Sequence, residues 1–96
     1  MIYLLVRYHF KSMEERNAFY EKVRDILDEI RSEEGNFLYE YCFPVDHENE
    51  ILLLEKWENQ KSLDAHGSSD ASRFIGKIKG EFEVKTDVEK IIAKEL

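Results

Sequence analysis

The chain has 96 residues, 43% hydrophobic and 36% charged, which suits one small globular domain over residues 1–96 and excludes two. Its formal net charge of −7 disfavours nucleic acid as a partner, because phosphate backbones attract basic surfaces. No apolar run approaches the roughly 20 residues of a membrane span, no glycine-rich phosphate motif predicts a nucleotide cofactor, and the single cysteine, Cys42, favours a cytoplasmic protein without an internal disulfide.

The first half of the chain predicts a strand, a helix and a turn. Residues 2–10 are rich in strand-forming residues, and every even position is apolar. Ser12 and Glu15 then form an S-x-x-E capping box, and apolar residues recur behind it at helical spacing, which predicts one helix from residue 13 to residue 31 or 32. Gly35 follows as the residue that suits a left-handed turn.

The second half predicts a hairpin, two short helices and a last strand. Residues 37–43 and 50–57 read as strands joined by a polar turn. Asn59 is expected to cap a helix that ends at Gly67, and Ser68 or Ser69 to cap another that stops at Gly80. Residues 82–88 alternate as a fourth strand, which reaches residue 92 if both late isoleucines belong to it.

This order predicts the α+β, ferredoxin-like βαββαβ fold, with a four-stranded antiparallel sheet and both helices on one of its faces. By alternation we place one apolar set on one face, Ile2, Leu4, Val6, Leu52 and Leu54. The other face receives Tyr3, Leu5, Ile51, Leu53 and Trp57. One apolar face is left over once the helices are placed, so we expect a homodimer that packs sheet against sheet.

Three short motifs in a fixed order resemble the antibiotic biosynthesis monooxygenase family, including its quinol-monooxygenase-like bacterial members. The motifs are E-x-G-N-x-x-Y over residues 33–39, E-x-W over residues 55–57, and L-x-x-H over residues 63–66. The resemblance implies a dimeric α+β barrel built from ferredoxin-like protomers. It also implies a cofactor-independent monooxygenase that oxidises a small electron-rich aromatic, such as a quinol or phenol, with O₂.

The same resemblance implies a set of site residues. His66 is expected to act as the catalytic acid or base, because an imidazole exchanges protons near neutral pH. The residues expected at the substrate are Trp57, Tyr39, Asn36, Glu55 and Arg7. Neither a cofactor nor a metal is expected. The chain departs from many relatives at Ala71, where they carry a second histidine, and its first strand lacks the asparagine of the haem-degrading branch.

Plainer interpretations remain open beside these. His66 could be an ordinary helix-end residue, and Trp57 could serve packing alone. For Glu55 a structural ion pair, with Arg7, Lys56 or Arg73 or with a second subunit, is favoured over work as a general base. At the level of function, two alternatives stand: a non-catalytic small-molecule-binding or stress-response domain, and an isomerase of a small carbonyl compound that uses His66 and Glu55.

Overall fold

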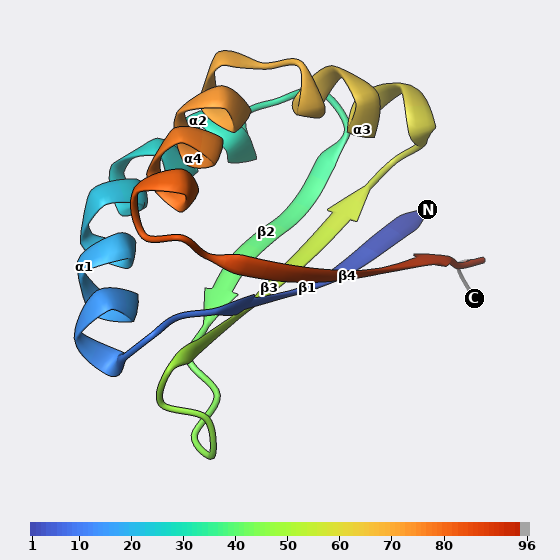
Figure 1. Ribbon diagram of the computed structural model, residues 1–96. Helices are drawn as coiled ribbons and strands as arrows, with labels where there is room; N and C mark the ends of the chain where they lie inside the picture. The colour runs from blue at the N-terminus through green and yellow to red at the C-terminus, as the bar shows by residue number, and fades with distance from the viewer. Residues whose placement is uncertain (95–96) are drawn as a thin grey trace.

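The computed structural model describes residues 1–94, which form a layer of helices over a single sheet (Figure 1). The elements in chain order are β1 (Ile2–His9), α1 (Met13–Val23), the 3₁₀ turn η1 (Arg24–Ile26), α2 (Leu27–Arg31), β2 (Asn36–Cys42), β3 (Glu50–Trp57), α3 (Gln60–Gly67), α4 (Asp70–Glu81) and β4 (Lys85–Ile92). None of the helices in this described part is long and apolar enough to cross a membrane.

The strands lie in the order β2-β3-β1-β4, and each neighbouring pair is antiparallel. All helices cover the same face of the sheet (Figure 1). This is the ferredoxin-like arrangement, in which two βαβ units interleave so that the first and third strands are central. The predicted fold class is therefore confirmed.

Side-chain caps start the helices where the sequence predicts them. The hydroxyl of Ser12 accepts the Glu15 amide at 3.1 Å. The Asn59 side chain accepts the amide at the third residue of α3 at 2.9 Å, and the Ser69 hydroxyl does the same for α4 at 3.1 Å. Each cap satisfies an amide that has no partner within its helix.

Two helix predictions need correction. The first helix is not continuous, because the Leu27 amide bonds the carbonyl three residues back, at Arg24, and this tighter turn separates α1 from α2. The last helix runs past Gly80 to Glu81 and closes with a left-handed residue at Glu83, whose φ is 50°. The amide of the next residue, Val84, then bonds the Lys79 carbonyl at 3.0 Å, so the fourth strand begins at residue 85 rather than 82.

The predicted grouping of apolar residues on the two faces is wrong by one residue between β1 and β3. Leu5 pairs with Leu54, and Val6 pairs with Leu53. Directly paired residues point to the same face, so Leu54 lies with Leu5, and Leu53 with Val6. Alternation within a strand does not define its register against a neighbour, and a one-residue shift exchanges the faces.

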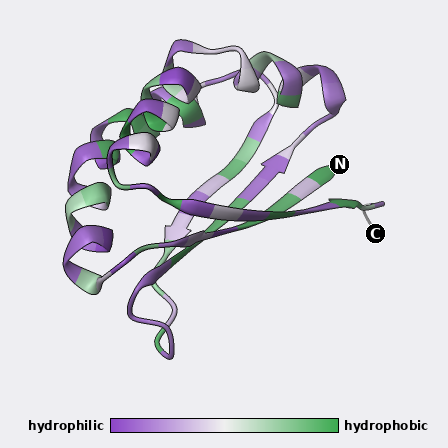
Figure 2. Cartoon of the chain, in the orientation of Figure 1, coloured by the Kyte–Doolittle hydropathy of each residue, from purple (hydrophilic) through white to green (hydrophobic). Residues whose placement is uncertain are grey.

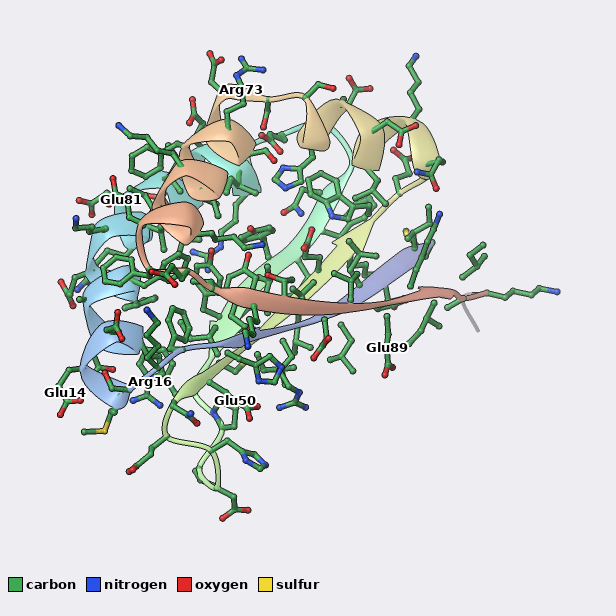
Figure 3. All side chains as sticks on the ribbon, viewed as in Figure 1. Glu14, Arg16, Glu50, Arg73, Glu81 and Glu89 are labelled. Atoms are coloured by element: carbon green, nitrogen blue, oxygen red, sulfur yellow. The ribbon has the colours of Figure 1, made fainter. Side chains whose placement is uncertain are left out.

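The helix-covered face holds the core. Its largest side chains with under 2% exposure are Trp57, Phe19, Ile30, Ile51, Leu53 and Val23. The opposite face, here called the open face, carries Tyr3, Leu5, Leu38, Leu52, Leu54 and Ile91. Hydrophobic residues gather at the paired ends of β1 and β4 (Figure 2), and Glu50 and Glu89 point away from the helices on the open side (Figure 3).

Candidate active site

A cavity of about 240 Å³, here called the sheet cavity, lies between α4 and the helix-covered face of the sheet. Its apolar lining includes Leu4, Val6, Ile75 and Val88, and its polar lining includes Tyr8, Tyr39, Glu55, His66, Ser72 and Lys79. An apolar cavity of roughly 150 Å³ is enough to hold benzene. The sheet cavity therefore has room for one aromatic ring with a few substituents.

Glu55 is a buried carboxyl without an ion-pair partner among residues 1–94. Its side chain comes from β3 and is 6% exposed, and one carboxyl oxygen accepts the indole N–H of Trp57 at 2.9 Å. Burial raises the pKa of Glu55, while the indole hydrogen bond and the nearby His66 act in the opposite direction. A carboxyl of this kind can give a proton to a ligand, or take one from it, closer to neutral pH than an exposed glutamate.

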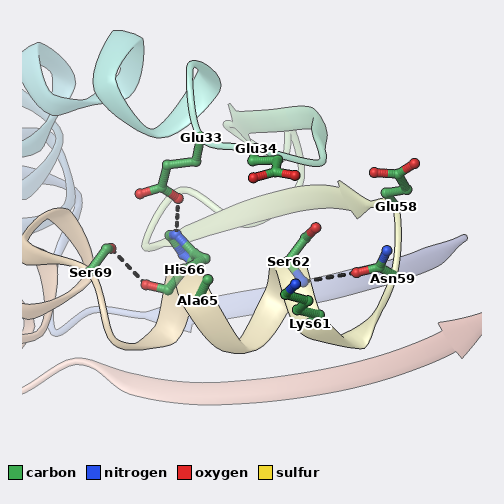
Figure 4. A pocket seen from close by; sticks show the side chains of 9 residues that line it. All are labelled: Glu33, Glu34, Glu58, Asn59, Lys61, Ser62, Ala65, His66 and Ser69. Carbon is green, nitrogen blue, oxygen red and sulfur yellow. Dashed lines mark hydrogen bonds and ion pairs between the residues drawn. The ribbon is translucent and has the colours of Figure 1, made fainter.

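His66 is held on three sides at the end of α3. Its ring stacks on the Trp57 ring with centroids 4.7 Å apart, and the edge of Tyr39 approaches with centroids 5.6 Å apart. Its Nδ1 atom lies 2.7 Å from a carboxyl oxygen of Glu33 in the turn before β2 (Figure 4). Trp57 thus positions both candidate proton carriers, Glu55 through its N–H and His66 through its ring face.

Lys79 adds a cation to the lining of the sheet cavity. Its ammonium lies 4.7 Å from the centre of the Tyr8 ring, and burial lowers its pKa while the charge of Glu55 opposes that shift. Burial also raises the pKa of Tyr8 and of Tyr39 well above the usual value, so both hydroxyls stay protonated and can donate hydrogen bonds. The cavity therefore presents the Lys79 cation to a ligand, beside two tyrosine hydroxyls that also lie within reach of Tyr41.

The structure brings together four of the six residues that the sequence placed at the site. Tyr39, Glu55 and His66 line the sheet cavity, and Trp57 lies fully buried behind Glu55 and His66. Asn36 lies at the start of β2, where its amide donates to the Leu38 carbonyl at 3.1 Å, outside this lining.

Arg7 lies on the open face, and its guanidinium bonds Glu50 at 2.8 Å. Arg7 therefore does not line the sheet cavity, although the family resemblance implies that it contacts the substrate. The structural ion pair favoured for Glu55 is also absent within residues 1–94. Arg73 pairs instead with Asp70, and Lys56 lies on the open face opposite Tyr3.

Three residues of this site were not predicted from the sequence. Lys79 lies four residues after Ile75, so a lysine on the buried stripe of α4 was a signal in the pattern itself. Tyr8 was visible only as one of several apolar positions in β1. Glu33 belongs to the E-x-G-N motif, but its contact with His66 joins residues 33 positions apart, which no local pattern reveals.

Comparison with known proteins shows which family this chain matches. The family model described as antibiotic biosynthesis monooxygenase matches residues 1–75. The curated protein named “Putative monooxygenase YcnE”, from Bacillus subtilis, is 30% identical over 56 residues, which cover 58% of this chain and 59% of that protein.

Solved structures share the whole fold. A crystal structure of a “putative antibiotic biosynthesis monooxygenase” from Deinococcus radiodurans is 18% identical with a TM-score of 0.89, and the match covers 100% of this chain and 95% of that one. A conserved protein from Methanosarcina mazei is 22% identical with a TM-score of 0.84, over 98% and 94% of the two chains. At these identities the structures support the fold, while the family model covers most of the sequence: the chain belongs to the antibiotic biosynthesis monooxygenase family.

Proposed function

We propose that this protein is a cofactor-independent monooxygenase that uses O₂ to oxidise a small electron-rich aromatic, a phenol or a quinol, in the sheet cavity. One observation carries the proposal: Glu55, a buried carboxyl with no ion-pair partner among residues 1–94, shares a cavity of single-ring size, lined by both polar and apolar side chains, with His66 and Lys79. Groups that can move a proton and hold an anion are what such a substrate requires.

The chemistry begins with the substrate hydroxyl. His66 accepts its proton, and the ammonium of Lys79 stabilises the phenolate that results. The electron-rich ring then reduces O₂ itself. For a phenol, the carbon opposite the hydroxyl exchanges C–H for C=O, and the hydroxyl becomes the second C=O. The second oxygen atom of O₂ leaves as water, with the hydrogen from that ring carbon and the hydrogen from the hydroxyl. The ring therefore supplies all four electrons, and no external reductant is needed.

Oxygen consumption tests this proposal directly. The wild-type protein is incubated with a panel of phenols, hydroquinones and anthrones, and products are identified by mass spectrometry after labelling with ¹⁸O₂. We expect turnover with at least one compound and a loss of roughly 10²- to 10⁴-fold in His66→Ala, the usual share of a general base. The matched control is His47→Ala, a histidine in the exposed turn before β3. Absence of turnover across the panel, or equal rates in both variants, contradicts the proposal.

A second candidate function rests on the pairing of two proton carriers in one cavity. Glu55 and His66 could move a proton between two carbons of a small carbonyl compound, which would make the protein an isomerase. Incorporation of solvent deuterium into a carbonyl substrate, without oxygen uptake, identifies this case. Binding of a ligand in a one-to-one ratio with no product identifies a binding domain that uses the same cavity.

The active form is proposed to be a homodimer that buries the open face. That face presents a hollow of about 290 Å³ lined by Tyr3, Leu5, Leu38, Leu54 and Ile91, among others. Ile91 is 49% exposed, and every residue of β4 is exposed. An exposed edge strand beside an apolar patch on a sheet face is normally covered by another protein surface.

A further inference from the structure

His66 lies between two cavities. The second cavity, of about 340 Å³, lies between α3 and the turn before β2, and its lining includes Glu33, Glu34 and Glu58 (Figure 4). We call it the acidic cavity. Among residues 1–94, His66 is the one residue that lines both this cavity and the sheet cavity, while Glu33 lines the acidic one. The imidazole therefore meets Glu33 on one side and the proposed substrate space on the other.

The backbone around Glu33 is fixed in a turn that packs on α3, the helix that carries His66. The amide of Glu33 donates to the Ile30 carbonyl at 3.0 Å, and its carbonyl accepts the Asn36 amide at 3.1 Å. Gly35 completes this turn with a φ of 81°, and a Cβ atom there would collide with the Ser62 side chain on α3. The turn is thus packed directly on the helix that carries His66.

The side chains are as constrained as the backbone. The His66 side chain is 10% exposed and that of Glu33 is 20% exposed. The Ser69 hydroxyl donates to the His66 carbonyl at 2.6 Å, which secures the end of α3. With Trp57 stacked on the ring, the imidazole has little freedom to turn its nitrogens over.

A carboxylate accepts hydrogen bonds and does not donate them, so the nitrogen 2.7 Å from Glu33 must carry a hydrogen. We propose that Glu33 is the positioning residue of His66. It holds the neutral imidazole with the hydrogen on Nδ1, which leaves the lone pair on Nε2 as the proton acceptor for the sheet cavity. The carboxylate also stabilises the imidazolium that forms when Nε2 takes a proton. The inference rests on the proposed function for its purpose, but the tautomer is a property of the protein without substrate.

Nitrogen NMR of the ligand-free protein tests this inference. Protein labelled with ¹⁵N-histidine is measured at a pH where the imidazoles are neutral, and the His66 signals are assigned by their loss in His66→Gln. We expect the wild-type spectrum to show hydrogen on Nδ1 of His66, and Glu33→Ala to lose that preference in favour of hydrogen on Nε2. Glu34→Ala is the matched control, because Glu34 lines the same acidic cavity without a contact to the imidazole.

Each result of this NMR experiment either supports or overturns the proposed role of Glu33. Hydrogen on Nε2 in the wild type overturns the inference, as does a tautomer that survives Glu33→Ala or that Glu34→Ala alters equally. If Glu33→Ala disturbs folding, seen as a lost near-ultraviolet circular dichroism signal, Glu33→Gln takes its place. An amide can donate to Nδ1 as well as accept from it, so the preference for hydrogen on Nδ1 should weaken, and an unchanged spectrum contradicts the inference. Oxygen uptake plays no part here, so failure of the proposed oxidation is distinguished from failure of this contact.

Discussion

The two faces of the sheet use the same strands for different purposes. On the helix-covered face the ionisable groups Glu55 and Lys79 lie half or fully buried in a cavity with no carboxylate–ammonium contact between them. On the open face Arg7 bonds Glu50 at 2.8 Å, and His9 bonds Asp87 at 2.8 Å. Charges left without close partners around a cavity are suited to chemistry, whereas charges paired around an apolar surface are suited to assembly.

The largest expected effect on stability comes from Trp57→Ala on the helix-covered face. Trp57 is fully buried and supports both Glu55 and His66, so its truncation should cost about 3–5 kcal/mol of the free energy of unfolding. Urea unfolding followed by circular dichroism measures the loss. Leu52→Ala, on the open face of the same strand, should cost less than half as much. Equal losses in the two variants would show that the helix-covered face contributes no more to the free energy of unfolding than the open face.

A charge on the open face should act on assembly instead. Leu54→Asp places a carboxylate at the proposed two-fold contact, and each dimer would bring two copies near each other. We expect the free energy of association to weaken by roughly 2 kcal/mol or more, the scale of an interface hot spot. Sedimentation should give twice the 11.5 kDa chain mass for the wild type and a smaller mass for the variant. A wild-type protein that sediments as a monomer at micromolar concentration contradicts the dimer.

The two faces should also respond oppositely to pH. Burial raises the pKa of Glu55 above its unfolded value, so its contribution to stability is present at low pH and is lost as the pH rises through the folded-state pKa. Glu55→Gln removes this loss and should be more stable than the wild type at pH 8, with a smaller difference at pH 4. Glu29→Gln, at an exposed position on α2 away from the open face, is the control. Denaturant unfolding at the two pH values measures both, and a wild type that is favoured at pH 8 contradicts the expectation.

The smallest effect on stability is expected from breaking the ion pair between Arg7 and Glu50. The hydrogen bond from Arg7 holds the pKa of Glu50 below its usual value, so this contribution is present above the unfolded pKa and is lost as the pH falls through the folded-state pKa. Arg7→Gln should lower the free energy of unfolding by up to about 1 kcal/mol at pH 7, because the pair is partly exposed to solvent. The same comparison in high salt should show a smaller difference. A larger loss at pH 3 than at pH 7 would contradict the assignment.

Local signals predicted most of the secondary structure. Ser12, Asn59 and Ser69 cap their helices as expected, because a cap depends on residues three positions apart. Gly35 adopts the left-handed turn for a similarly local reason. The last helix was misjudged at Gly80 because the left-handed residue that closes it is Glu83, a residue type that seldom takes this conformation.

The candidate site was only partly predictable. Glu55, Trp57 and His66 stand out through motifs whose order resembles a family, and the structure brings them into contact or close to one another. Arg7 lies outside the sheet cavity, which the sequence could not indicate because the face on which Arg7 lies depends on which side of the sheet the helices cover. Glu33 and Lys79 were missed because their neighbours come from distant segments of the chain.

The amino-acid sequence by itself determined the order of strands and helices, the fold class and the surplus of apolar strand residues, because these follow from local propensity and periodicity. Only the tertiary structure decided which residues share a face of the sheet and which side chains line the cavity. Those properties depend on strand register and on helix packing over long sequence distances, where a shift of one residue exchanges buried and open positions. The charge of −7 and the length of 96 residues fit every one of those arrangements equally well.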